Sequence, residues 1–181
     1  MDAADEAVVR SCIRVVQDWP KAGVSFQDLS GVMADARAFR IVVDALARRV
    51  EGLGVDSVIG IEARGFPYGA ALAHHLGAGF ITMRKPGKLP GLVHARQYEL
   101  EYGSATLELH QDAVGPGHRV VIIDDVLATG GTAGAAVDLV GLCGAQMVAL
   151  LVVMDLPFLG GRSVLEARGT VVHALLTPTP G

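Results

Sequence analysis

The sequence predicts an α/β protein with a single parallel, twisted sheet flanked by helices. Three observations predict this class. Short apolar runs rich in β-branched residues, of which 119–123 is the strongest, are typical of buried strands. Helical patterns of roughly 10–15 residues separate these runs, as in a doubly wound sheet. The length of 181 residues suits one domain, because domains usually hold about 100–200 residues, and no repeat or low-complexity linker divides the chain.

The helices are predicted by apolar residues at helical spacing and by signals at their ends. Asp35 can cap a helix that runs to about Glu51, and Gly77 closes the next helix. We therefore expect helices at residues 5–16, 36–51, 66–76 and 133–142.

The strands are predicted by continuous or alternating apolar runs. We expect extended segments at residues 24–26, 55–61, 79–83, 105–110, 119–123, 147–154 and 170–176. A Gly-Pro-Gly sequence at 115–117 predicts a turn. The polar segment 86–104 is the one long connection, and long connections in compact domains are often lids.

Composition and charge exclude several classes of protein. Hydrophobic residues make up 51% and charged residues 19%, which excludes an intrinsically disordered chain. The net charge is 15 − 19 = −4 and only one short cluster is basic, so we expect no binding to nucleic acid.

Mean hydropathy is high, at +0.42, so a membrane protein must be considered. The longest apolar stretch, 139–154, is shorter than the ~20 residues of a membrane span, and two glycines interrupt it. The acidic N-terminus lacks the positive region of a signal peptide. Cys12 and Cys143 lie in apolar helical patterns typical of buried thiols. We therefore expect a cytoplasmic protein that does not enter a membrane.

The most informative segment is a buried strand followed by two carboxylates, a loop of small residues and a helix. Asp124 and Asp125 follow the strand, and the loop is Ala128-Thr129-Gly130-Gly131-Thr132. Glycines let backbone N–H groups approach an anion, and a helix N-terminus adds partial positive charge. The carboxylates can accept hydrogen bonds from sugar hydroxyls. The pattern predicts a ribose 5-phosphate site, whereas a lone Gly-Gly would indicate only a helix-start turn.

Two other nucleotide-binding motifs do not occur in the sequence. It holds no G-x-x-x-x-G-K-[ST], which excludes a P-loop nucleoside triphosphatase, and no G-x-G-x-x-G after its first strand, which leaves a nicotinamide dehydrogenase unsupported. The histidines form no metal-ligand motif either.

The 120–132 segment resembles the phosphoribosyl diphosphate (PRPP) motif of type I phosphoribosyltransferases, in the form found in members that use adenine. The resemblance extends over about 13–176. It implies that Asp124 and Asp125 bind the ribose hydroxyls and help to stabilise the positive charge that develops at C1. It implies that the 5′-phosphate is held by Ala128, Thr129, Gly130, Gly131 and Thr132. It also implies an N-terminal hood, about residues 1–34, and a flexible lid loop, about residues 86–104.

The resemblance assigns pyrophosphate to two further segments. The first, 60–66, could by itself be a helix start with a surface arginine; in the family it binds pyrophosphate, here through Ala63 and Arg64. Family members often hold it in a non-proline cis peptide, which we expect next to Ala63. The second, 84–91, could by itself be a solvated charge run. Cations stabilise a leaving pyrophosphate, and the resemblance implies this role for Arg84, Lys85 and Lys88, with Arg84 able to reach a neighbouring subunit.

The lid acid and the base site are also implied by the resemblance. Glu101, in a Leu-Glu-Tyr-Gly context, corresponds to the family's general acid/base and would relay a proton near N7 of adenine while N9 attacks. Tyr102 would help the lid to close and exclude water. The adenine-binding residues would be Ser25, Phe26, Gln27 and Leu159.

Within that base site, an aromatic side chain at Phe26 can stack on a purine. Without the resemblance, Phe26 and Leu159 would be core or edge residues. The family often has a basic residue where this chain has Gln27.

The resemblance as a whole implies a homodimer that transfers the 5-phosphoribosyl group of PRPP to adenine and forms AMP and pyrophosphate, as in purine salvage. Mg²⁺ would arrive with PRPP and be bound mainly by substrate oxygens, because this ion uses few protein ligands. Two alternatives stay open. One is the same reaction with a 6-oxopurine, which needs a donor such as a lysine. The other is a PRPP-sensing regulator without catalysis.

Overall fold

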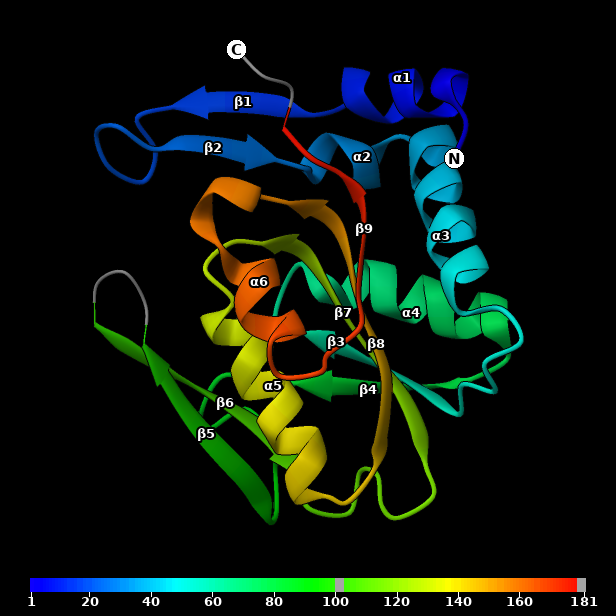
Figure 1. Cartoon of the computed structure of the whole chain (residues 1–181), viewed down its shortest axis with the longest axis vertical. Coiled ribbons are helices and arrows are strands. Elements are labelled where there is room, and N and C mark those ends of the chain that lie inside the picture. Colours follow the sequence, from blue (N-terminus) through cyan, green and yellow to red (C-terminus); the bar gives the residue numbers. More distant parts are fainter. Residues whose placement is uncertain (100–102, 179–181) are drawn as a thin grey trace.

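The fold is a five-stranded parallel sheet between two layers of helices, which confirms the predicted class (Figure 1). The computed structural model describes residues 1–99 and 103–178. The strand order is β4-β3-β7-β8-β9. The strands are β3 (Ser57–Ile61), β4 (Gly79–Met83), β7 (Arg119–Leu127), β8 (Gln146–Asp155) and β9 (Val172–Leu176).

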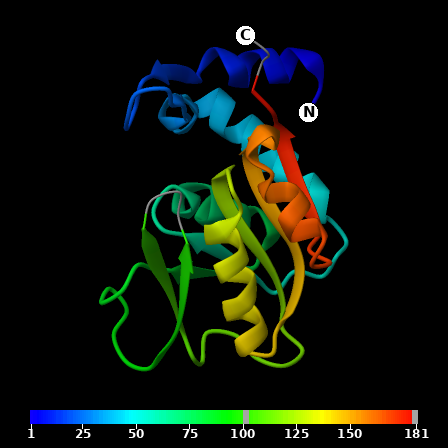
Figure 2. The ribbon, with the colours of Figure 1, turned by 60° about the vertical axis from the view of Figure 1, so that its left-hand side comes forward.

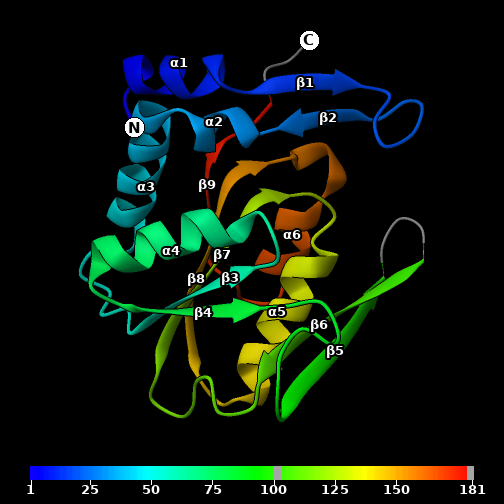
Figure 3. The same cartoon turned by 180° about the vertical axis from the view of Figure 1, so that it is seen from behind.

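Both faces of the sheet are buried, which explains why its strands are nearly continuous apolar runs. Helices α3 (Ala36–Val50) and α4 (Gly65–Leu76) cover one face, as Figure 3 shows, and α5 (Gly131–Leu142) covers the other. Successive side chains of a strand point to opposite faces. On β7, Val121 and Ile123 accordingly pack in the α3–α4 core, and Val120 and Ile122 pack in the α5 core.

The predicted helix ends are confirmed at two positions. The side chain of Asp35 accepts hydrogen bonds from the backbone N–H groups of Arg37 and Ala38, at 3.0 and 2.8 Å, and so caps α3. Gly77 ends α4 with φ +67°, a left-handed conformation that glycine adopts without steric cost.

The N-terminal region is an antiparallel ribbon between short helices, at the top of the molecule in Figure 1. Its elements are α1 (Ala3–Ser11), β1 (Arg14–Gln17), β2 (Ser25–Asp28) and α2 (Ser30–Ala34). The expectation of one helix over 5–16 was wrong, because the helix ends at Ser11. Residues 14–17 pair instead with 25–28, a contact that local helical spacing does not reveal.

The segment 86–104 is not one long unstructured connection, so that expectation was wrong as well. Residues 93–99 form β5 (Val93–Glu99), which pairs antiparallel with β6 (Ser104–His110). The hairpin projects beside α5 (Figure 2). Arg96 Nε donates a hydrogen bond of 2.9 Å to Asp138 of α5 and ties the two elements together.

Smaller elements complete the chain. A 3₁₀ turn at Pro157–Leu159 (η1) and a short helix α6 (Gly161–Glu166) follow β8, and sequence patterns did not predict either. None of the helices in residues 1–99 and 103–178 is long and apolar enough to span a membrane.

Candidate active site

A cavity of about 320 Å³ lies where β7 and β8 reach their carboxyl ends, and it is called the main cavity because it gathers most of the predicted site residues. Ligands of open α/β sheets bind at this edge. The walls come from β2, from the turn before α4, from the end of β7 and its connection to α5, and from β8 and the turn that follows it. The predicted residues that line it are Ser25, Phe26, Gln27, Arg64, Asp124, Asp125, Ala128, Thr129, Gly130, Gly131, Thr132 and Leu159.

The loop 128–132 joins the end of β7 to the N-terminus of α5. Gly130 has φ +86°, which only glycine adopts readily. A Cβ atom on Gly131 would lie 2.7 Å from the carbonyl oxygen of Glu99, so the hairpin backbone packs directly on this loop. Free backbone N–H groups at a helix start form a site for a phosphate or another anion.

Two carboxylates stand next to this loop. Asp125 is 3% exposed and forms an ion pair with Nε of Arg64. Asp124 accepts a hydrogen bond of 2.9 Å from the backbone N–H of Asp125. Burial, and then the negative charge of Asp125, raise the pKa of Asp124 well above its ordinary value. The pair presents acceptor oxygens to the cavity, together with a proton that Asp124 holds more tightly than an exposed carboxyl would.

Arg64 connects the acidic pair to the N-terminal ribbon. Its guanidinium carbon lies 5.5 Å from the centre of the Phe26 ring, within cation–π distance. Trp19 packs edge-on against the same ring, with centroids 4.3 Å apart and an interplanar angle of 66°. These contacts hold Phe26 at the cavity wall, where a flat apolar ligand can stack on it.

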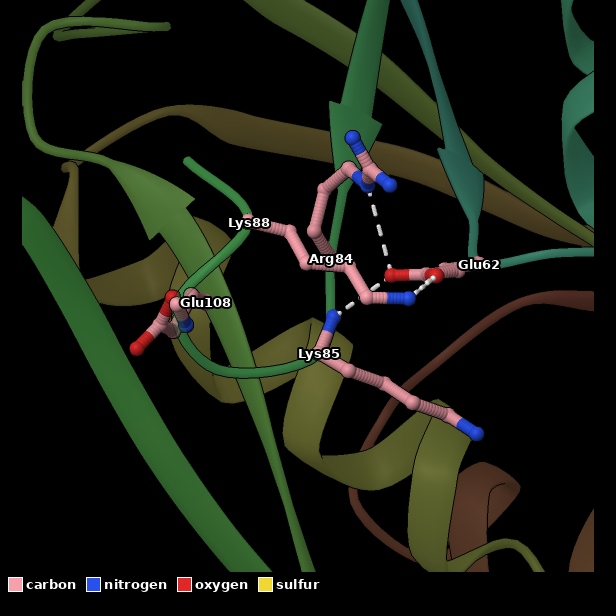
Figure 4. A network of polar contacts seen from close by, with 6 residues as sticks. Glu62, Arg84, Lys85, Lys88 and Glu108 are labelled. Carbon is pink, nitrogen blue, oxygen red and sulfur yellow. Dashed lines mark hydrogen bonds and ion pairs between the residues drawn. The ribbon is translucent and has the colours of Figure 1, made fainter. Parts of the chain in front are cut away.

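A second cluster surrounds Glu62, which does not line the main cavity; Figure 4 shows its contacts. The carboxylate accepts hydrogen bonds from Nζ of Lys88 at 2.5 Å, from the backbone N–H of Lys85 at 2.8 Å and from Nε of Arg84 at 3.3 Å. Burial alone would raise the pKa of Glu62, but these hydrogen bonds outweigh it and lower the pKa to about 2. Glu62 is therefore a charged anchor for the 84–88 segment.

The structure thus groups the predicted residues unevenly. Arg84, Lys85 and Lys88 gather on Glu62 and do not line the main cavity. The Glu62–Ala63 peptide is cis, which confirms the expected non-proline cis bond.

Glu101 and Tyr102 lie outside the described residues. Sequence analysis missed the anchoring role of Glu62 and also missed Val24 and Leu156, which line the cavity beside predicted residues. Only the position of Glu62 next to Ala63 could have drawn attention to it.

The residues described contain no group of three or more His, Cys, Asp or Glu side chains that could hold a metal ion. Asp124 and Asp125 offer a pair of carboxylates next to the 128–132 loop, which we call the anion loop. Mg²⁺ is commonly bound by one or two carboxylates together with substrate phosphates, and this donor set fits that use.

Comparisons with known proteins agree on one family. A family model described as phosphoribosyl transferase domain matches residues 33–163. The chain is 51% identical over 171 residues to the adenine phosphoribosyltransferase of Paracoccus denitrificans, which covers 94% of this chain and 91% of the relative. It is 49% identical to that of Neorhizobium galegae, over 97% of both chains.

Solved structures agree with these relatives. The crystal structure of adenine phosphoribosyltransferase from Rhodothermus marinus superposes with a TM-score of 0.91 at 42% identity, and the match covers 98% of this chain and 100% of the Rhodothermus marinus chain. The Saccharomyces cerevisiae enzyme, solved with an imino-altritol bisphosphate and adenine, superposes with a TM-score of 0.90 at 36% identity, over 97% and 100% of the two chains.

Proposed function

Because the chain belongs to the phosphoribosyltransferase family, we propose that it transfers the 5-phosphoribosyl group of PRPP to adenine and forms AMP and pyrophosphate. One observation carries the proposal: the main cavity joins an anion loop, a carboxylate pair and an aromatic wall in one space. Those three surfaces suit the phosphate, the ribose and the base of a nucleotide. N9 of adenine forms a bond to C1 of the sugar as the bond from C1 to pyrophosphate breaks.

The 128–132 loop binds the 5′-phosphate through its backbone N–H groups and the hydroxyls of Thr129 and Thr132. Asp124 and Asp125 accept hydrogen bonds from the ribose hydroxyls. The negative charge of Asp125 and the acceptor oxygens of both side chains also stabilise positive charge that develops at C1 as the leaving group departs. The half-exposed Arg64, paired with Asp125, stands at the boundary between this part of the cavity and the exterior.

The cations near Glu62 receive the pyrophosphate. Ala63 contributes backbone and Arg64 contributes its guanidinium, while Arg84, Lys85 and Lys88 supply positive charge from the neighbouring segment. Arg84 and Lys88 already face one carboxylate, so the 84–88 segment is preorganised to meet a second anion. A second copy of the chain is the partner that the family resemblance implies for Arg84.

Adenine lies between Phe26 and Leu159, both of which line the cavity. Backbone groups of Ser25 and Gln27 meet the polar edge of the base. Glu101 relays the proton near N7 while N9 attacks, and Tyr102 helps to close the site against water.

Asp124 and Asp125 would contribute oxygen ligands to a Mg²⁺ ion that accompanies PRPP, and most other ligands would come from substrate and water. When bound, the ion would supply positive charge that stabilises the departing pyrophosphate. A cytoplasmic homodimer is part of this proposal.

The test is pyrophosphate release from PRPP and Mg²⁺ with each purine base offered separately. Release with adenine alone is expected. Release with a 6-oxopurine would keep the reaction and overturn the assignment of the base site. Binding of PRPP with no release from any base would instead favour the regulator.

A further inference from the structure

The turn that follows β8, residues 156–161, touches both halves of the proposed active site, and this inference rests on the proposed function. Leu156 and Leu159 line the main cavity on the base side. At the other end of the turn, the backbone N–H of Gly161 donates a hydrogen bond of 3.1 Å to the carbonyl oxygen of Ala128. The base wall and the anion loop therefore share one short support.

The contact between the turn and the anion loop is very close. A Cβ atom on Gly161 would lie 2.2 Å from the carbonyl oxygen of Ala128 and 2.6 Å from the backbone nitrogen of Gly130. Conversely, a Cβ atom on Gly130 would lie 3.1 Å from Cα of Gly161. The two backbones are packed without room for a side chain, so a shift of the turn must shift the loop.

An ion pair joins the two ends of this turn. Nε of Arg162 donates a hydrogen bond of 2.7 Å to Oδ2 of Asp155, whose side chain is 2% exposed. The same guanidinium donates through Nη1 to the carbonyl oxygen of Val172 on β9, at 2.9 Å. Arg162 thus fixes the start of α6 to the end of β8 and to the neighbouring strand.

Asp155 depends on this one partner. Its other oxygen, Oδ1, is buried and has no hydrogen-bond partner within residues 1–99 and 103–178. A buried carboxylate that loses its cation is strongly unfavourable, so the pair persists whenever the turn is in place. The third contact of Arg162, with Glu166 at 3.1 Å, involves a half-exposed carboxylate and adds little.

We infer that Arg162, through its pair with Asp155, is a positioning residue that sets the Leu159 wall and the 128–132 loop together. Its side chain is not among those that line the cavity. It acts by holding the 156–161 turn in the one arrangement that suits both the base and the 5′-phosphate. A misplacement of about 1 Å at a remote support can cost as much as ~100-fold in rate, so the effect on substrate constants should be large.

The test compares Arg162→Lys, which keeps the charge but loses the planar fork of donors, with the wild type and with Glu166→Gln as matched control. We expect Arg162→Lys to raise the KM for adenine and the KM for PRPP together, each by about tenfold or more at a temperature well below its Tm. Glu166→Gln should leave both constants unchanged. A lower Tm with unchanged KM values, or a change in only one KM, would overturn the inference.

One further variant keeps the test decisive if Arg162→Lys does not fold. Gly161→Ala leaves the ion pair intact but pushes the turn from the anion loop, and the same joint rise is expected; a change in the PRPP constant alone would contradict the coupling. Where Arg162→Lys does fold, it should have a smaller effect on the adenine KM in a Leu159→Ala background than in the wild type, since coupled sites are not additive. Additive effects would show that Arg162 does not act through Leu159. Wild-type protein that forms no AMP would refute the proposed function itself, which is a separate result.

Discussion

Replacing Glu62 by glutamine should destabilise the protein by about 1–2 kcal/mol. The change keeps the shape of the side chain and its acceptor for the Lys85 N–H, and removes only the negative charge. The oxygen that accepts from the Lys85 N–H also accepts from Nε of Arg84 at 3.3 Å, so these two contacts become hydrogen bonds to a neutral acceptor. The 2.5 Å hydrogen bond from Nζ of Lys88 to the other oxygen is lost.

The size of the effect follows from burial. Hydrogen bonds to charged groups contribute about 1.5–3 kcal/mol to stability when they are buried away from water, whereas exposed ion pairs contribute only about 0.2–1 kcal/mol. The Glu62 side chain is 8% exposed, but that of Lys88 is 47% exposed, so water screens one side of the pair. A loss between these limits should lower the Tm by about 2–8 °C in a chain of this size.

The assay is urea unfolding at a fixed protein concentration, with Glu108→Gln as the matched control. Glu108 also holds the 84–88 segment, through a hydrogen bond of 3.1 Å from the backbone N–H of Gly87 that a glutamine oxygen can still accept. We expect no measurable loss for the control. Equal losses for the two variants, or a Glu62→Gln loss that high salt does not reduce, would refute an electrostatic anchor.

The difference in unfolding free energy between the wild type and Glu62→Gln should depend on pH. The folded state lowers the pKa of Glu62 from 4.5 to about 2. Its stabilising contribution is therefore complete above pH 4.5 and is lost as the pH falls from 4.5 towards 2. The stability difference between wild type and Glu62→Gln should shrink over that window, and a difference that stays constant would contradict the assignment.

Three further predictions concern the proposed reaction. Phe26→Ala should raise the adenine KM by about tenfold with the PRPP KM unchanged, because one stacked base is worth ~1–3 kcal/mol; steady-state kinetics with each substrate varied would show it. Asp125→Asn should lower kcat/KM for PRPP by about 10–100-fold, since ribose and Arg64 both lose a charged acceptor, and unchanged kcat/KM would remove Asp125 from the ribose site. Glu101→Gln should lower kcat by about 100-fold or more while PRPP affinity, measured by calorimetry, stays the same; equal losses in both would make Glu101 a positioning residue instead.

Much of the fold could be predicted because its signals are local. The apolar run 119–123 predicts a strand and Asp35 predicts a helix cap, each from a few neighbouring residues, and both predictions are confirmed. The errors share one physical cause. Strands β1 and β5 are stabilised by pairing with β2 and β6, and local patterns, which do not register such pairing, predict a helix over 5–16 and a long connection over 86–104.

The candidate site follows the same rule. The anion loop and its carboxylates are contiguous in sequence, and the cavity brings them together as expected. Glu62 and Arg162 could not be predicted, because each owes its role to a partner from another element. Glu62 gathers cations 22 to 26 residues away, and Arg162 holds a carboxylate on β8 and a carbonyl on β9.

Different elements of the fold supply different surfaces of the cavity, and this arrangement bears on base specificity. The proposed 5′-phosphate and ribose surfaces come from β7 and the start of α5, whereas the proposed base surface comes from β2 and the 156–161 turn. A change of purine would therefore require changes only at the second pair of elements. The two pairs are not independent, however, because Gly161 packs on Ala128 and Gly130. Substitutions that reshape the turn to accept another base must preserve that contact, or PRPP binding will weaken with adenine binding.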